Sequence, residues 1–192
     1  MSVSKKLAVL LGCGMLLGAA QLTAAPTAIM LADTCAGCHG TDGASTGPAT
    51  PSLAGMSEEY MVESMEAFKS GERPSTVMGR IAKGYSKDEF KLMGSVFAKQ
   101  PVTITSQNLD AAKVAAGAKL YGKNCEKCHD KNGALADDDS GILASQWLTY
   151  LQYSMADFQA GSREMVKKMK KKVDKLSDDE LEALLQFFAS QQ

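Results

Sequence analysis

Hydrophobic residues recur at helical spacing along this chain, and no segment shows the pattern of a parallel sheet. The clearest cases follow Ser86 and Ser177, where apolar side chains stand three and four positions apart. Each serine is followed three residues later by a glutamate, Glu89 or Glu180, which forms the capping box of a helix N-terminus. The pattern therefore predicts an all-α protein in which each half of the chain ends in a capped helix.

Two further helices are expected, a long one over residues 112–124 and a shorter counterpart over residues 28–34. Between the halves, proline, β-branched and polar residues interrupt the helical pattern. We therefore predict two domains, residues 26–100 and 113–192, joined by a linker over residues 101–112.

The second half of the chain repeats the first with a shift of 90 residues. CAGCHG at 35–40 aligns with CEKCHD at 125–130, and YMVESMEAFKSGER from Tyr60 aligns with YLQYSMADFQAGSR from Tyr150. One inserted residue after this match changes the shift to 91. Similarity over this length indicates that the two domains arose by internal duplication.

The first 25 residues do not follow the repeat. Lys5 and Lys6 precede an apolar run over residues 7–20, and small residues precede Pro26. This order is typical of a secretory signal peptide. We predict that residues 1–25 are cleaved and that the exported chain has no membrane span. Cys13 lies inside the apolar run, so we interpret it as part of the signal and not as a lipidation site.

Composition and charge narrow the possible functions. The chain has 192 residues, of which 45% are hydrophobic and 22% charged, values near those of globular domains. Removing residues 1–25 takes away two lysines and no acids, so the net charge changes from −1 to −3. This mild acidity argues against nucleic acid as a partner. The other four cysteines all lie in two CxxCH units, which argues against a scattered disulfide framework.

A CxxCH unit can be a redox dithiol, part of a zinc site, or an attachment site for haem. A dithiol favours a βαβ context and needs no histidine. A structural zinc site needs a fourth ligand, but His39 and His129, the two histidines of the chain, already belong to the units. Covalent haem uses every residue, because the thiols form thioethers and the histidine ligates the iron. We predict two haem c groups, bound by Cys35, Cys38, Cys125 and Cys128.

The second iron ligand is expected to be a methionine, and nine of the eleven methionines lie beyond residue 25. Met78 and Met169 are a repeated pair, each eight residues before the serine cap of its last helix. Met165 is the rival for the second site but has no counterpart in the first half. We predict His39/Met78 and His129/Met169 ligation. Such closed iron sites favour electron transfer over a haem enzyme such as a peroxidase, which needs an open or labile position.

Other charged and aromatic residues allow two interpretations each. The repeated Arg73 and Arg163 either cap a helix in solvent or pair with haem propionates. Trp147, which aligns with Ser57, provides either local packing or a haem contact. The lysines around Met169 form either a solvated helix face or a docking surface for an acidic partner. These lysines are Lys167, Lys168, Lys170, Lys171 and Lys172.

Each half resembles a class I cytochrome c, and the whole chain resembles dihaem cytochromes c. Within these, it is most similar to the cytochrome subunits of flavocytochrome c sulfide dehydrogenases. The resemblance covers essentially the whole chain after the signal. It rests on CAGCHGTDGAS, MEAFKSGE, MGRIAKGYS, KLYGKNCEKCH, ILASQWLTYLQYSMADF and the ending FFASQQ.

This resemblance implies tandem class I cytochrome c domains and a periplasmic electron-transfer subunit that is not an enzyme on its own. It would accept electrons from an FAD-containing flavoprotein that oxidises sulfide, and pass them to a soluble carrier such as a small cytochrome c. The chain has no dinucleotide-binding glycine pattern, so the flavin would be held by the partner. The alternative is a free-standing dihaem cytochrome that delivers electrons to a terminal oxidase.

Overall fold

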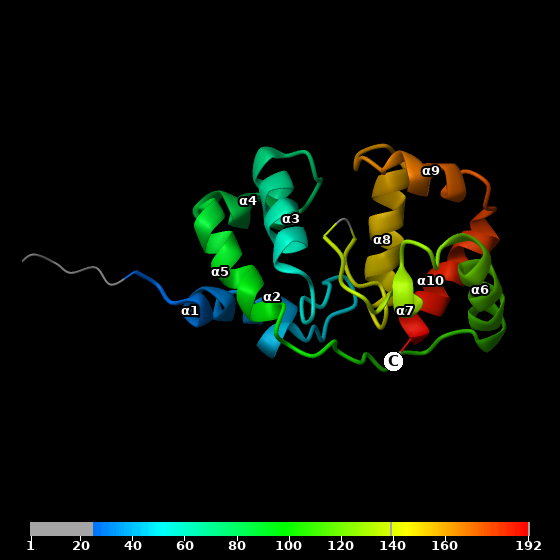
Figure 1. Cartoon of the computed structure of the whole chain (residues 1–192), viewed down its shortest axis with the longest axis horizontal. Helices are drawn as coiled ribbons and strands as arrows, with labels where there is room; N and C mark the ends of the chain where they lie inside the picture. Colours follow the sequence, from blue (N-terminus) through cyan, green and yellow to red (C-terminus); the bar gives the residue numbers. More distant parts are fainter. Residues whose placement is uncertain (1–24, 139, 192) are drawn as a thin grey trace, which may run out of the picture.

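The computed structural model describes residues 25–138 and 140–191, so the predicted signal peptide lies, apart from Ala25, outside the described residues. All regular elements in these ranges are helices, which confirms the prediction of an all-α fold. The two halves of the chain lie side by side, with the first half at the left of Figure 1 and the second at the right. None of the described helices is long and apolar enough to cross a membrane.

The two halves contain the same series of longer helices. In each, a helix before the CxxCH unit packs against the last helix, α1 on α5 and α6 on α10. The elements of the first half are α1 (Ala28–Asp33), α2 (Ala36–His39), η1 (Thr41–Gly43), α3 (Glu58–Ser70), α4 (Met78–Ile81), η2 (Ala82–Gly84) and α5 (Lys87–Phe97). Those of the second half are α6 (Ala111–Asn124), α7 (Asp130–Gly133), α8 (Leu148–Gln159), α9 (Lys167–Val173) and α10 (Asp178–Ser190).

Local signals define where these helices begin. Both predicted capping boxes are present: the side chains of Ser86 and Ser177 accept hydrogen bonds from Glu89 and Glu180, whose carboxylates accept from the serine N–H groups. The expected helix before the second CxxCH unit begins at Ala111, where Asp110 caps it.

The crossing of α6 and α10 depends on one glycine. A Cβ atom at Gly117 would lie 2.1 Å from the carbonyl oxygen of Ala183 and 2.7 Å from the Cβ of Phe187. The absence of a side chain at this position therefore lets the two helix backbones approach closely. Behind the crossing, the ring of Tyr121 packs against those of Phe187 and Phe188, with centroids 4.9 and 5.8 Å apart.

The hydrophobic core is divided between the halves, but one cluster crosses the boundary. The first cluster is built around Phe90, Met93 and Phe97 of α5, and it also buries Ile142 and Ala144 from the second half. The second cluster surrounds α10. Since apolar side chains of both halves share one core, the halves form a packed unit and not two separate bodies on a tether.

Two contacts that are equivalent under the repeat cross the boundary between the halves. The amide of Gln146 spans it: its Oε1 accepts from the N–H of Ser52 and its Nε2 donates to the carbonyl of Ser52, both at 2.9 Å. The shift of 90 residues carries Gln146 onto Met56 and Ser52 onto Ile142, and this second pair also meets, with the N–H of Ile142 3.2 Å from the sulfur of Met56. This reciprocity is the mark of an approximate twofold axis between the halves.

Candidate functional site

Each CxxCH unit folds as a helical turn that gathers its three reactive side chains. The N–H of His39 donates to the carbonyl of Cys35, and the N–H of His129 donates to the carbonyl of Cys125, both at 2.9 Å. Cysteine, cysteine and histidine stand at positions i, i+3 and i+4, which share one face of a helix. The local backbone therefore brings two sulfurs and one imidazole together in each half.

None of the four cysteines of these units forms a disulfide with a described residue. Cys38 and Cys128 are exposed, whereas Cys35 and Cys125 are half-buried. Burial raises the pKa of the Cys35 and Cys125 thiols above their ordinary value. Each unit thus presents one sulfur toward the core and one toward the surface, available for thioether formation.

The imidazole of His39 is held in one orientation. Its Nδ1 lies 2.8 Å from the carbonyl oxygen of Pro51, which can only accept, so Nδ1 carries the proton and the lone pair of Nε2 remains available. Burial lowers the pKa of both His39 and His129, although Pro51 opposes the shift at the first and Asp137 at the second. Neutral imidazole is the form that ligates metals.

A different contact fixes the second unit. The hydroxyl of Tyr121 donates to the carbonyl oxygen of His129 at 2.7 Å and accepts from the N–H of Asn132 at 2.9 Å. Tyr121 belongs to α6 and is buried. The helix before the unit therefore anchors the loop after it.

The methionines proposed from the sequence are half-buried. Met78 begins α4 and packs against the core cluster of the first half, while Met169 lies within α9. Met165 precedes α9 and is also half-buried, so exposure alone does not separate it from Met169. Met65 is buried in the core as expected for a packing residue, and Met155 packs against the second cluster.

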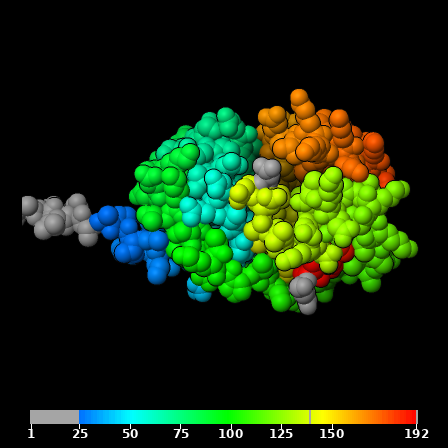
Figure 2. Space-filling model, viewed as in Figure 1, coloured from blue at the N-terminus to red at the C-terminus, as the bar shows by residue number. Residues whose placement is uncertain are grey.

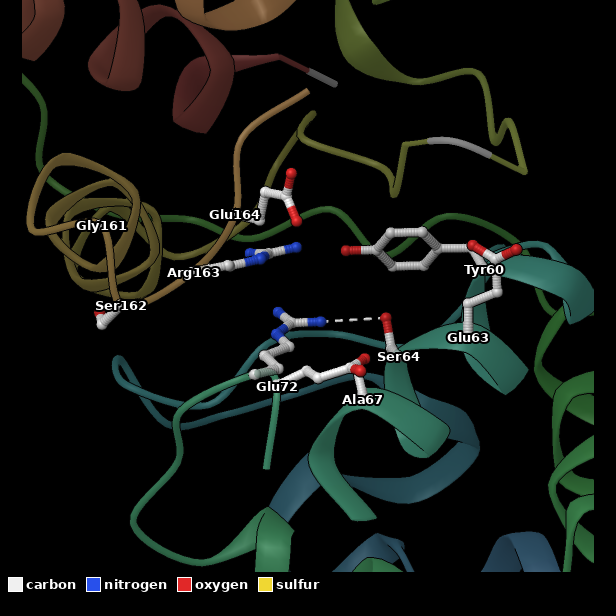
Figure 3. A pocket seen from close by; sticks show the side chains of 10 residues that line it. Tyr60, Glu63, Ser64, Ala67, Glu72, Gly161, Ser162, Arg163 and Glu164 are labelled. Atoms are coloured by element: carbon white, nitrogen blue, oxygen red, sulfur yellow. Dashed lines mark hydrogen bonds between the residues drawn. The ribbon is translucent and has the colours of Figure 1, made fainter. Parts of the chain in front are cut away.

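Arg73 and Arg163 do not lie in open solvent; they meet in a cavity between the halves (Figure 3). In each half the guanidinium donates to a serine of the helix that precedes it. Arg73 donates to Ser64 of α3 at 3.0 Å, and Arg163 donates to Ser154 of α8 at 2.8 Å. Each also stacks on a phenylalanine of its own half, at 4.6 Å in the first and 4.2 Å in the second. The repeated residues thus form two equivalent clusters.

The same arginines reach across the boundary toward tyrosines of the other half. Arg73 donates to the hydroxyl of Tyr150 at 3.4 Å, and Figure 3 shows Arg163 pointing toward the hydroxyl of Tyr60. Burial alone would raise the pKa of Tyr60, but the charges of the two arginines lower it below its ordinary value. The cavity has a volume of about 490 Å³, and Glu63, Glu72 and Glu164 also line it.

Neither arginine forms a salt bridge with a carboxylate among the described residues. A half-buried guanidinium without a carboxylate partner favours an anionic group beside it. Together with the two cysteine sulfurs and the neutral imidazole of each half, these arginines fit a haem c group, whose propionates carry negative charge. The donor set of the chain therefore suits the predicted cofactor.

The repeat pairs Tyr60 with Tyr150 but indicates no role for them, and the sequence allows either local packing or a haem contact for Trp147. The indole N–H of Trp147 donates to the carbonyl of Ser45 at 3.1 Å, across the boundary between the halves. Repetition was the signal available for the tyrosines, whereas Trp147 and Gln146 have no chemical counterpart in the first half and gave no such signal.

Two protein families cover the chain. Residues 24–111 match the family described as Cytochrome c, and residues 112–188 match the one described as Cytochrome C oxidase, cbb3-type, subunit III. The division between the two matches falls where the sequence repeat passes from one half to the other.

Three relatives are similar to different extents of the chain. The cytochrome subunit of sulfide dehydrogenase from Chlorobaculum tepidum is 50% identical over 68 residues, 35% of this chain and 61% of that relative. Cytochrome c4 from Pseudomonas aeruginosa is 31% identical over 67% of this chain and 68% of its own. The thiosulfate dehydrogenase electron acceptor of Stutzerimonas stutzeri is 28% identical over 81% of this chain and 78% of its own.

Among solved structures, reduced recombinant cytochrome c4 from Pseudomonas stutzeri superposes with a TM-score of 0.75 and 25% identity, covering 88% of this chain and all of that one. The predictions of tandem class I cytochrome c domains and of two covalent haem c groups at the CxxCH units are confirmed by these relatives. By its fold, its two CxxCH units and its similarity to cytochrome c4 along both halves, the chain belongs to the family of dihaem class I cytochromes c.

Proposed function

We propose that this electron-transfer protein serves as the cytochrome subunit of a periplasmic sulfide dehydrogenase. In this role it accepts electrons from an FAD-containing flavoprotein and passes them to a soluble carrier. The observation that carries the proposal is the 50% identity to the sulfide dehydrogenase subunit of C. tepidum, well above the identity to the other relatives. Because the alignment spans 61% of that relative, the activity and partner belong to the proposal.

Within this function, the iron of the first half is proposed to be ligated by His39 and Met78, and that of the second half by His129 and Met169. The free Nε2 of His39 supports the first pair, as does the half-buried thioether of Met78, which packs against the core of the first half. When bound, haem c supplies an iron that gains and loses one electron, and a methionine ligand raises its potential. The polypeptide holds the ligands and excludes water from them.

Arg73 and Arg163 are proposed to bind the haem propionates from the cavity between the halves. Their support is the lack of a salt-bridge partner among the described residues and the fork geometry that suits a carboxylate. Arg73→Lys and Arg73→Gln should both lower the potential of one haem, the glutamine more, since it removes a positive charge. An unchanged potential in Arg73→Gln would reject this contact.

The periplasmic part of the proposal rests on the signal-like residues 1–25. A second candidate function is a free dihaem carrier that delivers electrons to a terminal oxidase. It is supported by the cytochrome c4 alignment, which covers 67% of the chain against 35% for the sulfide dehydrogenase subunit.

The two functions differ in whether a flavoprotein stays bound. The native protein should be purified from the periplasmic fraction by gel filtration, with haem and flavin absorbance read together. We expect both absorbances in one peak, and sulfide-dependent reduction of an added cytochrome c by that peak but not by the isolated chain. A haem peak that elutes alone, with no flavoprotein bound at micromolar concentration, would favour the free carrier.

A further inference from the structure

The duplication allows the surfaces around the two haem sites to be compared position by position. In the first half, Val77 and Ile81 flank Met78, and they are 50% and 39% exposed. With the shift of 91 residues, their counterparts are Lys168 and Lys172, which flank Met169 and are exposed. Two exposed apolar side chains at one site are therefore replaced by two cations at the other.

The same replacement recurs on the other side of each site. Ile29 of α1 is 65% exposed and aligns with the exposed Lys119 of α6. Around the CxxCH units, three uncharged or acidic positions of the first half align with exposed lysines of the second. The aligned pairs are Asp33 with Lys123, Gly37 with Lys127, and Thr41 with Lys131.

These six lysines, which we call the lysine face, come from α6, the second CxxCH unit, α7 and α9. Its members are Lys119, Lys123, Lys127, Lys131, Lys168 and Lys172. Three of them lie within three residues of Cys125, Cys128 or His129 along the chain. Burial raises the pKa of the Cys125 thiol, and the charge of Lys172 opposes that shift, so α9 brings this ammonium into electrostatic range of Cys125. Figure 2 shows α9, in orange, beside the green and yellow-green segments of the second half.

The positive charge of the lysine face is not cancelled by ion pairs. None of the six forms a salt bridge with a described acid; Lys170, the lysine of α9 that does, pairs with Asp174 at 2.8 Å. Glu126 and Asp130 are the acids beside the CxxCH unit, and Asp137 acts on His129. Six unpaired ammonium groups therefore outnumber the nearby carboxylates, although the exported chain as a whole is acidic.

We propose that the lysine face is the docking surface for the electron acceptor, and that this acceptor is an acidic redox protein with a carboxylate-rich surface around its own cofactor. The proposal rests on the proposed electron-transfer function and adds the exit site. Cations around one cofactor edge steer an oppositely charged partner and raise the encounter rate by about 10- to 1000-fold at low salt. Because the rest of the chain is acidic, the lysine face attracts an acidic partner locally and orients it toward the second site and away from the first.

The test uses the reduced holoprotein and an acidic blue-copper protein as acceptor, mixed in a stopped-flow instrument at increasing NaCl. We expect the second-order rate constant of the wild type to fall about tenfold or more between low salt and 0.5 M salt, where charges are screened beyond about 4 Å. Lys168→Glu with Lys172→Glu should lower the low-salt rate constant about tenfold and flatten its salt dependence.

Two further variants separate local charge from total charge. Lys87→Glu with Lys99→Glu makes the same change in net charge at exposed positions of the first half, and should change the rate constant less than about twofold. Val77→Lys with Ile81→Lys places the second-half residues on the first site, and should raise the low-salt rate constant. Equal slowing by the two glutamate pairs would overturn the proposal, because net charge would then explain the rates.

Haem content, absorption spectra and potentials of every variant are measured beside the rates, so that a change in driving force is recognised. Co-elution with the flavoprotein is measured too. If no flavoprotein co-elutes with the wild type, the proposed sulfide dehydrogenase is rejected. If Lys168→Glu with Lys172→Glu leaves the rate constant unaltered, the docking surface is rejected. Binding to a membrane is tested by co-sedimentation with vesicles of about one-third anionic lipid. If the wild type co-sediments and the lysine variant does not, while the rate constant with the acceptor is unchanged, the lysine face binds a membrane and the proposal is overturned.

Discussion

At the scale of single residues, the chemistry of each haem site follows from a spacing of three and four. A helical turn places the side chains of positions i, i+3 and i+4 on one face, so the CxxCH unit needs little from the rest of the fold to assemble its donors. The rest of the fold sets the orientation and the tautomer of the histidine ring. The carbonyl of Pro51, twelve residues beyond His39, accepts from Nδ1 and so leaves Nε2 as the ligand atom.

The methionine ligands give the residue-scale prediction. Met78→Leu and Met169→Leu keep the side-chain volume but remove the thioether, so each should retain its covalent haem and lose the weak near-infrared methionine–iron band of one site. The potential of that site should fall by roughly 0.1 V, a small part of the range of about 0.8 V that axial ligands span. Absorption spectra and spectroelectrochemical titration measure both effects.

Met165→Leu is the matched control for the second site, because Met165 is half-buried and lies four residues before Met169. It should leave the band and both potentials unchanged. If Met165→Leu removes the band and Met169→Leu does not, the second ligand is wrongly assigned.

At the scale of elements, the packing of the first helix on the last is what closes each half. In the second half this crossing requires a glycine, because the Cβ of any other residue at position 117 would meet the backbone of Ala183. The helical pattern of residues 112–124 predicts this helix, but not that a backbone carbonyl of α10 occupies the space beside Gly117.

Gly117→Ala should therefore destabilise the holoprotein. A Cβ atom 2.1 Å from the carbonyl oxygen of Ala183 forces α6 away from α10, and overpacking of this kind lowers the free energy of unfolding by about 3 kcal/mol. Urea unfolding followed by circular dichroism measures the change. Gly122→Ala, in the same helix with open space around it, should instead be neutral or raise the free energy of unfolding by up to about 1 kcal/mol. Equal effects of the two substitutions would refute the role of the close crossing.

At the scale of the whole molecule, the two halves are joined by polar contacts between buried groups. Gln146 and Ser52 are 2% and 3% exposed, so water does not replace their hydrogen bonds. Tyr150 and Tyr60, which face the arginines of the opposite half, and Trp147, which reaches Ser45, extend the contact over the same boundary. This network fixes the position of one half relative to the other.

Gln146→Ala should weaken the contact between the two halves. It leaves the N–H and the carbonyl of Ser52 buried without a partner, which lowers the free energy of unfolding by about 2–6 kcal/mol, at about 1–3 kcal/mol for each group. Calorimetry should show a lower melting temperature and a broader transition, because the halves then unfold less cooperatively. Gln152→Ala removes a hydrogen bond to Glu182 within the second half, where both groups are half-exposed, and should cost less than about 1 kcal/mol. If Gln146→Ala is as stable as that control, Gln146 does not stabilise the contact between the halves.

The sequence by itself determined the features that depend on residues close together in the chain. The capping boxes at Ser86 and Ser177, the helical periodicity and the CxxCH units are local, and the duplication doubles each of these signals. The all-α fold and the haem-binding cysteines were therefore predictable, because short-range hydrogen bonds and side-chain spacing specify them.

Only the tertiary structure decided how the halves meet. The repeat aligns Arg73 with Arg163 and Tyr60 with Tyr150, but similarity at a fixed shift does not reveal that each arginine faces the tyrosine of the other half. At the boundary the aligned residues even differ in chemistry, as Met56 and Gln146 do, so no shared pattern marks them. Contacts between halves depend on the relative position of two folded surfaces, and that position is set by buried area and satisfied hydrogen bonds far apart in the chain.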